Sequence, residues 1–278
     1  MPRDDITKQI QPVLLKILKS FVDICDKYNL RYYLIDGSLL GAVRHNGFIP
    51  WDDDIDVGMP RPDYEKFCEI ARTELPTNMY LVSYEESLQK GSIAEIARMY
   101  CSDMQLKMDY FGNDQPSDTW MDIMIIYGMP RNSLMRTIHY KHYYLLKGLA
   151  RMGRIEHIGS RKYSGIEKIL IGIARKIDLS KIINTKGLLL RCVKLLKKYP
   201  YDGADYVIVV PSEYGINEMV PINYYEPGRF VDFDGVRVKI PHDYDGILKQ
   251  LYGDYMTPPP PEKRTSKHKV FIVNNKVD

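Results

Sequence analysis

The densest group of candidate catalytic residues is a run of four aspartates within five positions, Asp52, Asp53, Asp54 and Asp56. Asp54 and Asp56 flank an apolar residue in a strand-like run, and alternation along a strand places both carboxylates on one face. Two like charges on one face repel each other unless a cation lies between them. Carboxylate oxygens favour Mg²⁺ or Mn²⁺. The run predicts a divalent metal site with Asp52 as a further ligand, whereas Asp53 is expected to be exposed.

Two other interpretations of an acidic run are a solvated loop and a calcium-binding EF-hand. An EF-hand counted from Asp52 requires glycine at its sixth position and glutamate at its twelfth, where this chain has Val57 and Asp63. Pro60 and Pro62 also interrupt that loop. The EF-hand is therefore excluded, while the solvated loop stays open as the alternative to a metal site.

The segment before the aspartates has the pattern of a phosphate-binding site. Residues 31–35 form a short β-rich run, which leads into Gly37 and Ser38 and then into the short helical stretch 39–45. Glycine lets the backbone approach a ligand closely, and serine offers a hydroxyl group. The start of a helix presents free N–H groups to an anion. A Gly-Ser pair is common in ordinary turns, but here an Asp-x-Asp follows about 16 residues later.

Asp122 is the candidate for a third carboxylate in the site. It lies inside the apolar run 120–126, which is typical of a buried strand. A buried aspartate without a partner is costly, so we expect Asp122 to bind the metal or to act as the base for an attacking hydroxyl group. The alternative is an aspartate at a solvated strand end.

Three cationic or titratable residues are candidate anion ligands: Arg44, His45 and Arg98. The fork of an arginine side chain matches the geometry of a phosphate group. The alternatives are a surface ion pair for Arg98 and a helix cap for His45. In the C-terminal region, Lys263 and Arg264 follow a proline run and can either close over a bound donor or belong to a mobile basic tail.

The run from Tyr33 to Phe67 resembles the signature of the LicD family, which includes bacterial phosphorylcholine transferases and is related to the fukutin-type ribitol-phosphate transferases. It contains Gly-Ser-Leu-Leu-Gly-Ala-Val-Arg-His and Phe-Ile-Pro-Trp-Asp-Asp-Asp-Ile-Asp-Val. Weaker matches are Trp120–Met124 and Leu251–Pro260. The family is assigned to the nucleotidyltransferase fold, in which a Gly-Ser motif holds the donor phosphates. The resemblance implies that role for Gly37 and Ser38.

In that fold an Asp-x-Asp binds metal and a carboxylate on a neighbouring strand completes the site. The resemblance therefore implies metal binding by Asp54 and Asp56, completed by Asp122. Arg44 and His45 lie within the signature, and Arg98 matches it loosely. The reaction implied is transfer of phosphocholine, or of a related alcohol phosphate, from a CDP-linked donor such as CDP-choline to a sugar hydroxyl group. The acceptor would be a cell-surface glycan or teichoic acid precursor, lipid-linked or free, and CMP would be released.

The elements that must position these residues predict an α+β fold with a mixed sheet of the α/β type, in which a nucleotidyltransferase-fold core carries a basic helical subdomain. We expect residues 1–130 to form the catalytic core, 131–200 the helical subdomain and 201–278 a part that completes the active site. Helices are predicted over 5–28, 61–72, much of 132–198 and 243–251. Strands are predicted near 79–83, 93–100, 120–127, 206–210 and 229–240, with Asp234-Gly235 as a hairpin turn.

The net charge of +3 conceals a strong asymmetry along the chain. Residues 131–198 contain 17 Lys or Arg against Glu156, Glu167 and Asp178, a net of +14, whereas the other residues have 22 basic and 33 acidic side chains, a net of −11. A basic amphipathic helix binds anionic membranes or acceptors. The alternative is a helical subdomain that packs its apolar face on the core. No nucleic-acid-binding motif accompanies the charge, so nucleic acid is not an expected partner.

The rest of the composition is that of an enzyme of the cytoplasm. No apolar run approaches the 18 residues of a spanning helix, and the N-terminus lacks the order of a signal peptide. The four cysteines have no CxxC spacing and fit reduced thiols. We expect a cytoplasmic protein that can associate peripherally with the inner membrane face.

Two competing functions remain from the sequence. A glycosyltransferase also uses Asp-x-Asp, but it normally has a nucleotide-binding region of about 100 residues before that motif, by analogy of fold. Here only 53 residues precede Asp54, and the first 28 are predicted to be one helix. The other competitor is a non-catalytic binding module on a membrane surface. The joint presence of five residues argues against it: Gly37, Ser38, Asp54, Asp56 and Asp122.

Overall fold

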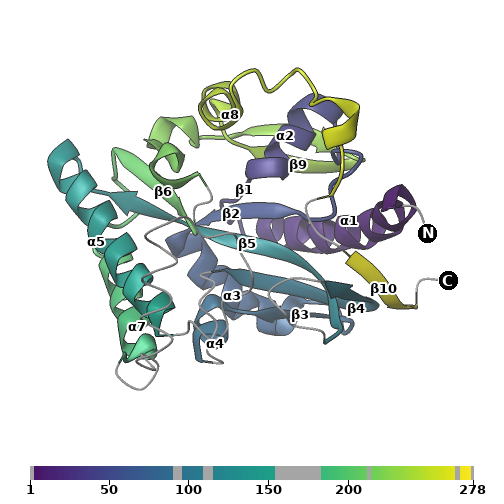
Figure 1. The fold of residues 1–278 in the computed structure, drawn as a ribbon, viewed down its shortest axis with the longest axis horizontal. Coiled ribbons are helices and arrows are strands. Elements are labelled where there is room, and N and C mark those ends of the chain that lie inside the picture. Colours follow the sequence, from purple (N-terminus) through teal and green to yellow (C-terminus); the bar gives the residue numbers. More distant parts are fainter. Residues whose placement is uncertain are drawn as a thin grey trace.

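The computed structural model describes residues 3–89, 96–108, 115–153, 183–211, 214–266 and 270–276. The strands are β1 Tyr33–Leu34, β2 Asp56–Pro60, β3 Met79–Val82, β4 Ala97–Met108, β5 Ser117–Met129, β6 Tyr206–Val210, β7 Met219–Pro221, β8 Arg229–Phe233, β9 Val236–Ile240 and β10 Val270–Asn275. The α-helices are α1 Arg3–Lys27, α2 Asp36–His45, α3 Arg61–Glu74, α4 Tyr84–Gln89, α5 Ser133–Met152, α7 Thr185–Leu196 and α8 Tyr244–Tyr252. Figure 1 shows their arrangement.

The centre of the fold is a mixed sheet of eight strands. Its main path runs β1-β2-β5-β4-β10, β3 also pairs with β4, and β6 pairs with β5 and β7. The β2–β5 pair is parallel and the other pairs of this sheet are antiparallel. A mixed sheet with helices on its faces confirms the predicted α+β class.

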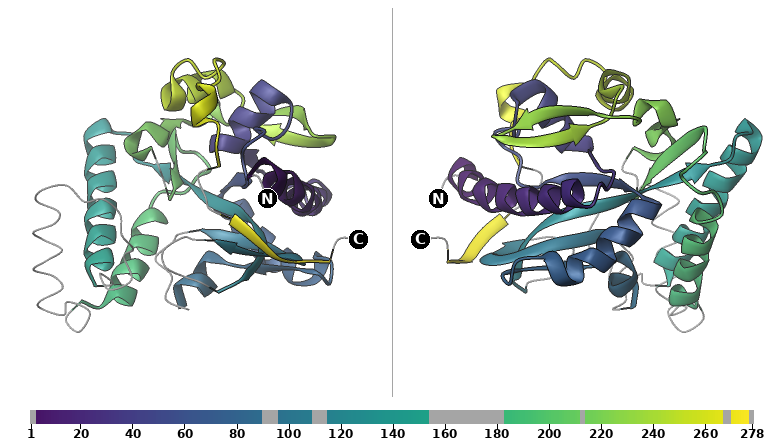
Figure 2. Two further views of the ribbon diagram at one scale, coloured as in Figure 1. Left: turned by 45° about the vertical axis from the view of Figure 1, so that its right-hand side comes forward. Right: turned by 180° about the vertical axis from the view of Figure 1, so that it is seen from behind.

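One face of this sheet is covered by α1 and α3, as the view from behind in Figure 2 shows for α1. On β5, Met121 and Ile123 are fully buried, whereas Trp120 and Asp122, which alternate with them along the strand, are only half-buried. Because side chains alternate between the faces of a strand, the second pair lies on the face that α1 and α3 leave open. On α1, Phe21 packs edge-on against Tyr32 with ring centroids 5.2 Å apart.

A separate two-stranded sheet, β8 and β9, lies together with α2 and α8 on one side of the molecule (Figure 1). Its turn is Asp234-Gly235, with φ of 48° and 83°. Positive φ at both central residues is typical of the tight hairpin turn that asparagine or aspartate followed by glycine favours. The predicted hairpin is therefore confirmed, as are the helix predicted over 5–28 and the strand over 206–210.

Helices α5 and α7 pack against each other at one end of the sheet (Figure 1). Each begins with an asparagine cap: Asn132 accepts a hydrogen bond from the N–H of Met135, and Asn184 accepts one from Gly187. The predicted helices in 132–198 are confirmed for these two elements. The part of this predicted helical segment that spans 154–182 lies outside the described residues. Among the described helices, none is both long and apolar enough to cross a membrane.

Several elements differ from the prediction. The helix α2 begins at Asp36, so the Gly-Ser pair lies in its first turn rather than in a turn before it. The helix α4 and the strand β10 were not predicted, and β10 pairs antiparallel with the second half of β4. Strand β2 begins at Asp56, two residues later than the strand-like run suggested.

Candidate active site

A cleft of about 550 Å³ opens on the sheet face that α1 and α3 do not cover. Its walls come from α2, the loop 49–56, β4, β5 and the C-terminal segment 252–265. It collects eight of the predicted site residues or their neighbours: Gly37, Arg44, Asp52, Asp53, Asp54, Asp56, Arg98 and Asp122. Ser38 and His45 lie beside it without lining it. Residues far apart in the sequence thus meet in one concave site.

The parallel pairing of β2 with β5 brings two of the predicted carboxylates together. Asp56 lies directly opposite Asp122 in the register, and the N–H of Asp122 donates to the carbonyl of Ile55 at 3.0 Å. Asp54 and Asp56 are half-buried, while Ile55 and Val57 are fully buried. The predicted alternation is present even though the strand begins only at Asp56.

The carboxylates of the cleft strongly affect one another. Burial raises the pKa of Asp56 well above its usual range, and the charges of Asp54, Asp122, Asp36 and Asp52 raise it further. In the absence of a cation, this arrangement favours a protonated Asp56. A divalent cation among these oxygens would remove the penalty, and hard oxygen ligands fit Mg²⁺ or Mn²⁺. The donor set therefore fits the predicted metal.

The tightest acidic group among the described residues is Asp52, Asp53 and Asp54, which each place one oxygen within 4.8 Å of the others. The expectation that Asp53 is exposed was wrong, because only 4% of this residue is accessible. The chain folds back at residues 49–53, where the N–H of Asp52 donates to the carbonyl of Ile49, and Asp53 forms part of the cleft wall.

The loop that carries the aspartates is held from two sides. The side-chain amide of Gln11 on α1 donates to the carbonyl of Asp52 at 3.0 Å. The carboxylate of Asp234, in the β8–β9 turn, accepts from the N–H of Phe48 at 2.9 Å, and the backbone N–H of Asp234 donates to the carbonyl of Asn46 at 3.0 Å. Gly47 lies against that carboxylate, where a Cβ atom would overlap it. These contacts fix the chain before the acidic run and at its first aspartate.

Gly37 and Ser38 connect α2 to the acidic loop and to β2. A Cβ atom on Gly37 would come within 3.0 Å of a carboxylate oxygen of Asp52, so glycine permits the close approach of helix and loop. The buried hydroxyl of Ser38 accepts a hydrogen bond from the N–H of Asp56 at 2.9 Å. A hydroxyl group can still donate while it accepts. Ser38 therefore fixes the start of β2 relative to the helix that lines the cleft.

Arg98 is paired inside the cleft rather than at the surface. Its Nε donates to Asp122 Oδ1 at 2.8 Å, and its guanidinium lies 4.7 Å from the centroid of the Trp120 ring. Burial alone lowers the pKa of Arg98, but the charge of Asp122 and the neighbouring Tyr100 outweigh it, so the pKa is raised. Arg98 has further N–H donors beyond the one that Asp122 uses.

Arg44 and His45 lie at the end of α2. The Arg44 guanidinium donates to the carbonyl of Tyr255 at 2.8 Å and thereby ties α2 to the C-terminal wall of the cleft. Burial and the nearby Arg264 lower the pKa of Arg44. Burial and the charge of Arg44 lower the pKa of His45, so its imidazole is neutral at pH 7.

Several cleft residues were not predicted from the sequence: Asp36, Trp51, Tyr214, Tyr252, Asp254 and Tyr255. The last three belong to the segment Leu251–Pro260 that was noted only as a weak motif match. Lys263 lines the cleft as well, and Arg264 lies 5.8 Å from the ring centroid of Trp51, which is itself a lining residue.

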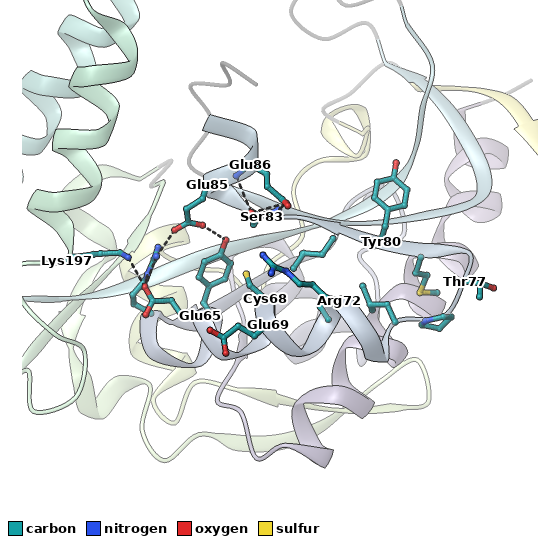
Figure 3. Close-up of a pocket in the computed structure, with 17 residues that line it drawn as sticks. Glu65, Cys68, Glu69, Arg72, Thr77, Tyr80, Ser83, Glu85, Glu86 and Lys197 are labelled. Carbon is teal, nitrogen blue, oxygen red and sulfur yellow. Dashed lines mark hydrogen bonds and ion pairs between the residues drawn. The ribbon is translucent and has the colours of Figure 1, made fainter. Parts of the chain in front are cut away.

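A second cavity, of about 640 Å³, lies between α3, β3 and α4 and shares no lining residue with the cleft. Figure 3 shows how its charged side chains pair across it. Arg61 contacts Glu65 at 2.8 Å and Glu85 at 2.6 Å, and Lys197 of α7 contacts Glu65 at 2.7 Å. This cavity holds none of the predicted site residues, so the acidic cleft is the candidate active site.

Comparison with known proteins agrees with the geometry. Residues 29–145 match the family described as LicD/FKTN/FKRP, nucleotidyltransferase domain. The lipopolysaccharide cholinephosphotransferase LicD of Haemophilus influenzae is 31% identical over 264 residues, which cover 94% of this chain and 95% of that protein. Ribitol 5-phosphate transferase FKRP of Homo sapiens is 50% identical, and that of Mus musculus 45%, over 51 residues that cover 18% of this chain and 10% of those proteins.

Proposed function

The chain belongs to the LicD/FKTN/FKRP family, and from this premise we propose that it is a metal-dependent phosphotransferase that moves phosphocholine from CDP-choline to a sugar hydroxyl group. The observation that supports this most is the parallel pairing of Asp56 with Asp122, beside Asp54, in the acidic cleft. The likeness to a cholinephosphotransferase along nearly the whole chain favours choline over ribitol or glycerol as the transferred alcohol.

The residues of the cleft divide into three roles. Asp54, Asp56 and Asp122 would hold Mg²⁺ or Mn²⁺, with Asp52 as a further ligand. When bound, the metal supplies positive charge against the diphosphate of the donor. Gly37 and Ser38 position the phosphates at the start of α2, where backbone N–H groups favour an anion.

The basic residues complete the binding of the donor. Arg98 keeps Asp122 in place and offers its remaining N–H groups to a phosphate oxygen. Arg44 holds the C-terminal wall against α2, and its cation lies in the same cleft. His45, with a neutral imidazole, supports Arg44, whose Nε lies 3.4 Å from His45 Nδ1.

The reaction follows from these positions. An acceptor hydroxyl oxygen forms a bond to the phosphorus that carries choline, and the bond from that phosphorus to CMP breaks. Asp122 orients the hydroxyl group and takes its proton. The products are a phosphodiester of the acceptor and CMP.

The acceptor would be a glycan precursor, free or lipid-linked, of the cell surface, because the relatives are named for lipopolysaccharide and for ribitol phosphate transfer. We propose that the protein works in the cytoplasm, at the inner membrane face, with the basic residues of 131–198 toward anionic lipid.

A thermal-shift panel tests the proposed donor. The protein is heated with CDP-choline, CDP-ribitol, CDP-glycerol or a nucleotide sugar, each with magnesium or with EDTA. A ligand that binds only the native state raises the melting temperature by mass action. We expect the largest increase with CDP-choline and magnesium together. A larger increase with a nucleotide sugar would favour a glycosyltransferase, and no increase with any CDP-linked donor would contradict the proposal.

A further inference from the structure

Two parts of the cleft lining place aromatic rings beside charges of opposite sign: two tyrosines lie near a carboxylate, and two tryptophans lie near arginines. At the end between α2 and α8, Tyr214 and Tyr252 meet edge to face, with ring centroids 5.4 Å apart. Asp36, the first residue of α2, lines the same end. Burial raises the pKa of Tyr252, and the charge of Asp36 raises it further, which is the effect of a carboxylate close to the phenol.

Elsewhere in the cleft lining, the two tryptophan rings already face cations. The guanidinium of Arg98 lies 4.7 Å from the Trp120 ring centroid, and that of Arg264 lies 5.8 Å from the Trp51 ring centroid. A second cation placed on either ring would be repelled by the arginine beside it. A cationic ligand is therefore disfavoured at Trp51 and Trp120.

The backbone holds Asp36 in an unusual conformation. Its φ is 48°, in the left-handed region that residues other than glycine adopt seldom, although aspartate and asparagine tolerate it best. Such conformations persist where the surrounding structure fixes them, often at functional sites. Here the left-handed residue is the one that begins α2 and places a carboxylate at the aromatic end of the cleft.

We propose that Asp36, Tyr214 and Tyr252 form the subsite for the quaternary ammonium group of the donor. A trimethylammonium group is attracted by the faces of aromatic rings and by a carboxylate, and it needs no hydrogen-bond acceptor. A neutral polyol such as ribitol or glycerol lacks the positive charge for these two attractions and would meet the carboxylate only through hydroxyl hydrogen bonds. The subsite thus determines which alcohol phosphate is transferred, and this inference rests on the proposed phosphotransferase function.

The test compares two donors that differ only in charge: CDP-choline and its neutral carbon isostere, the CDP ester of 3,3-dimethylbutanol. The readout is the ratio of kcat/KM for the charged donor to that for the neutral donor. Asp36→Asn keeps the shape and the tolerance of positive φ but removes the charge. We expect it to lower the ratio about tenfold, the scale of a desolvated cation contact. A loss of metal affinity would lower both activities and leave the ratio unchanged.

Two further variants separate the ring from the hydroxyl group of Tyr252. Tyr252→Leu should lower the ratio, whereas Tyr252→Phe retains the aromatic ring and should preserve it. Asp254→Asn is the matched control, because Asp254 is another carboxylate of the same cleft that hydrogen-bonds Thr257 at 2.7 Å. We expect Asp254→Asn to leave the ratio unchanged.

The outcomes distinguish the subsite from the proposed function. If the wild-type protein transfers from neither donor, the phosphotransferase function itself is contradicted. If it transfers from both donors and Asp36→Asn leaves the ratio unchanged, or if Asp254→Asn lowers it equally, the subsite is overturned while the function stands.

Discussion

The environment of Asp56 disfavours the negative charge of its own carboxylate. It is held opposite Asp122 by the register of β2 and β5, and its N–H is fixed by the Ser38 hydroxyl. Burial raises its pKa, and the neighbouring aspartates raise it further. The metal-free protein therefore carries a penalty in this cleft that a bound cation relieves.

Asp56→Asn should raise the melting temperature of the protein in EDTA, by roughly 2–4 °C for each kcal/mol of relieved penalty. A carboxyl group whose folded pKa is raised destabilises the folded state as the pH rises above the unfolded value of about 3.9. The gain should therefore be larger at pH 7 than at pH 4. Calorimetry at the two pH values measures it.

Asp254→Asn is the matched control for this change, because Asp254 lines the same cleft but lies outside the acidic run and the proposed ligand set. Magnesium should raise the melting temperature of the wild-type protein but hardly that of Asp56→Asn. An equal magnesium effect on wild type and Asp56→Asn would exclude Asp56 as a ligand.

At the scale of single residues, the sequence predicts the side-chain positions that follow from the periodicity of a strand. The common face of Asp54 and Asp56 follows from alternation along one strand, and Asp122 follows from its apolar neighbours. The burial of Asp53 depends on how the loop folds back, and the placement of Asp36 depends on a positive φ. Neither the burial of Asp53 nor the placement of Asp36 can be predicted from the types of the neighbouring residues.

Among the elements, the loop that precedes β2 depends on contacts from opposite ends of the chain. Gln11 of α1 and Asp234 of the β8–β9 turn hold its backbone. The hairpin has no residue in the cleft lining, yet it fixes the chain at Phe48, four residues before the acidic run begins at Asp52. Its role is therefore to position the loop rather than to bind the donor.

Gly47→Ala should disrupt this clamp, because the new methyl group overlaps the Asp234 carboxylate that holds Phe48. We expect a loss of stability of about 1–3 kcal/mol, as in other overpacked sites, together with reduced turnover. Denaturant unfolding and steady-state kinetics measure the two effects. Gly148→Ala is the matched control: its Cβ meets open space on α5, and alanine in a helix should stabilise by about 1 kcal/mol.

The double variant Gly47→Ala with Asp234→Gly tests whether the clash is the cause. Removing the Asp234 side chain should make the two changes less than additive. Wild-type stability in Gly47→Ala, or strict additivity in the double variant, would contradict the clamp.

Elements whose signals are local were predicted well. The hairpin follows from Asp234-Gly235, and the helix α1 from its long apolar periodicity. The strand β10 was missed because its partner, β4, lies more than 150 residues earlier in the chain. The C-terminal wall of the cleft was likewise only indicated by a motif match, since its position depends on the contact of Arg44 with Tyr255.

Across the whole molecule, charge and exposed apolar surface coincide on α5 and α7. Helix α5 exposes five large apolar side chains, with exposed fractions of 66%, 45%, 50%, 62% and 38% for Leu134, Met135, Ile138, Leu145 and Leu149. These residues belong to the segment with the net charge of +14. The combination of positive charge and exposed apolar side chains favours an anionic lipid surface as the partner of these helices. The division of the chain into parts at residues 130 and 200 stays a prediction.

Binding to anionic vesicles should fall steeply with added salt, because exposed charges are screened over about 8–10 Å at physiological ionic strength. Arg191→Glu with Lys194→Glu on α7 should weaken binding and reduce turnover of a lipid-linked acceptor, but not of a short soluble one. Vesicle sedimentation and the two assays measure this. Lys197 is left intact because it pairs with Glu65 of α3.

The matched control is Lys8→Glu with Lys66→Glu, which changes the net charge equally on α1 and α3. Equal loss of vesicle binding in both double variants would point to total charge rather than to this surface. Equal loss of turnover on both acceptors would indicate damaged packing, and an absence of vesicle binding at low salt would contradict the membrane role.

The central claim is that Asp54, Asp56 and Asp122 act together in metal-dependent phosphotransfer. The most direct measurement is release of CMP from CDP-choline, with a soluble glycan acceptor, as magnesium is titrated into the EDTA-treated protein. We predict that CMP and phosphodiester form in equal amounts and only with the metal. Asp54→Asn and Asp122→Ala should each lower turnover by at least about 10². Turnover that persists in EDTA, or full turnover of either variant at saturating donor and magnesium, would contradict the claim.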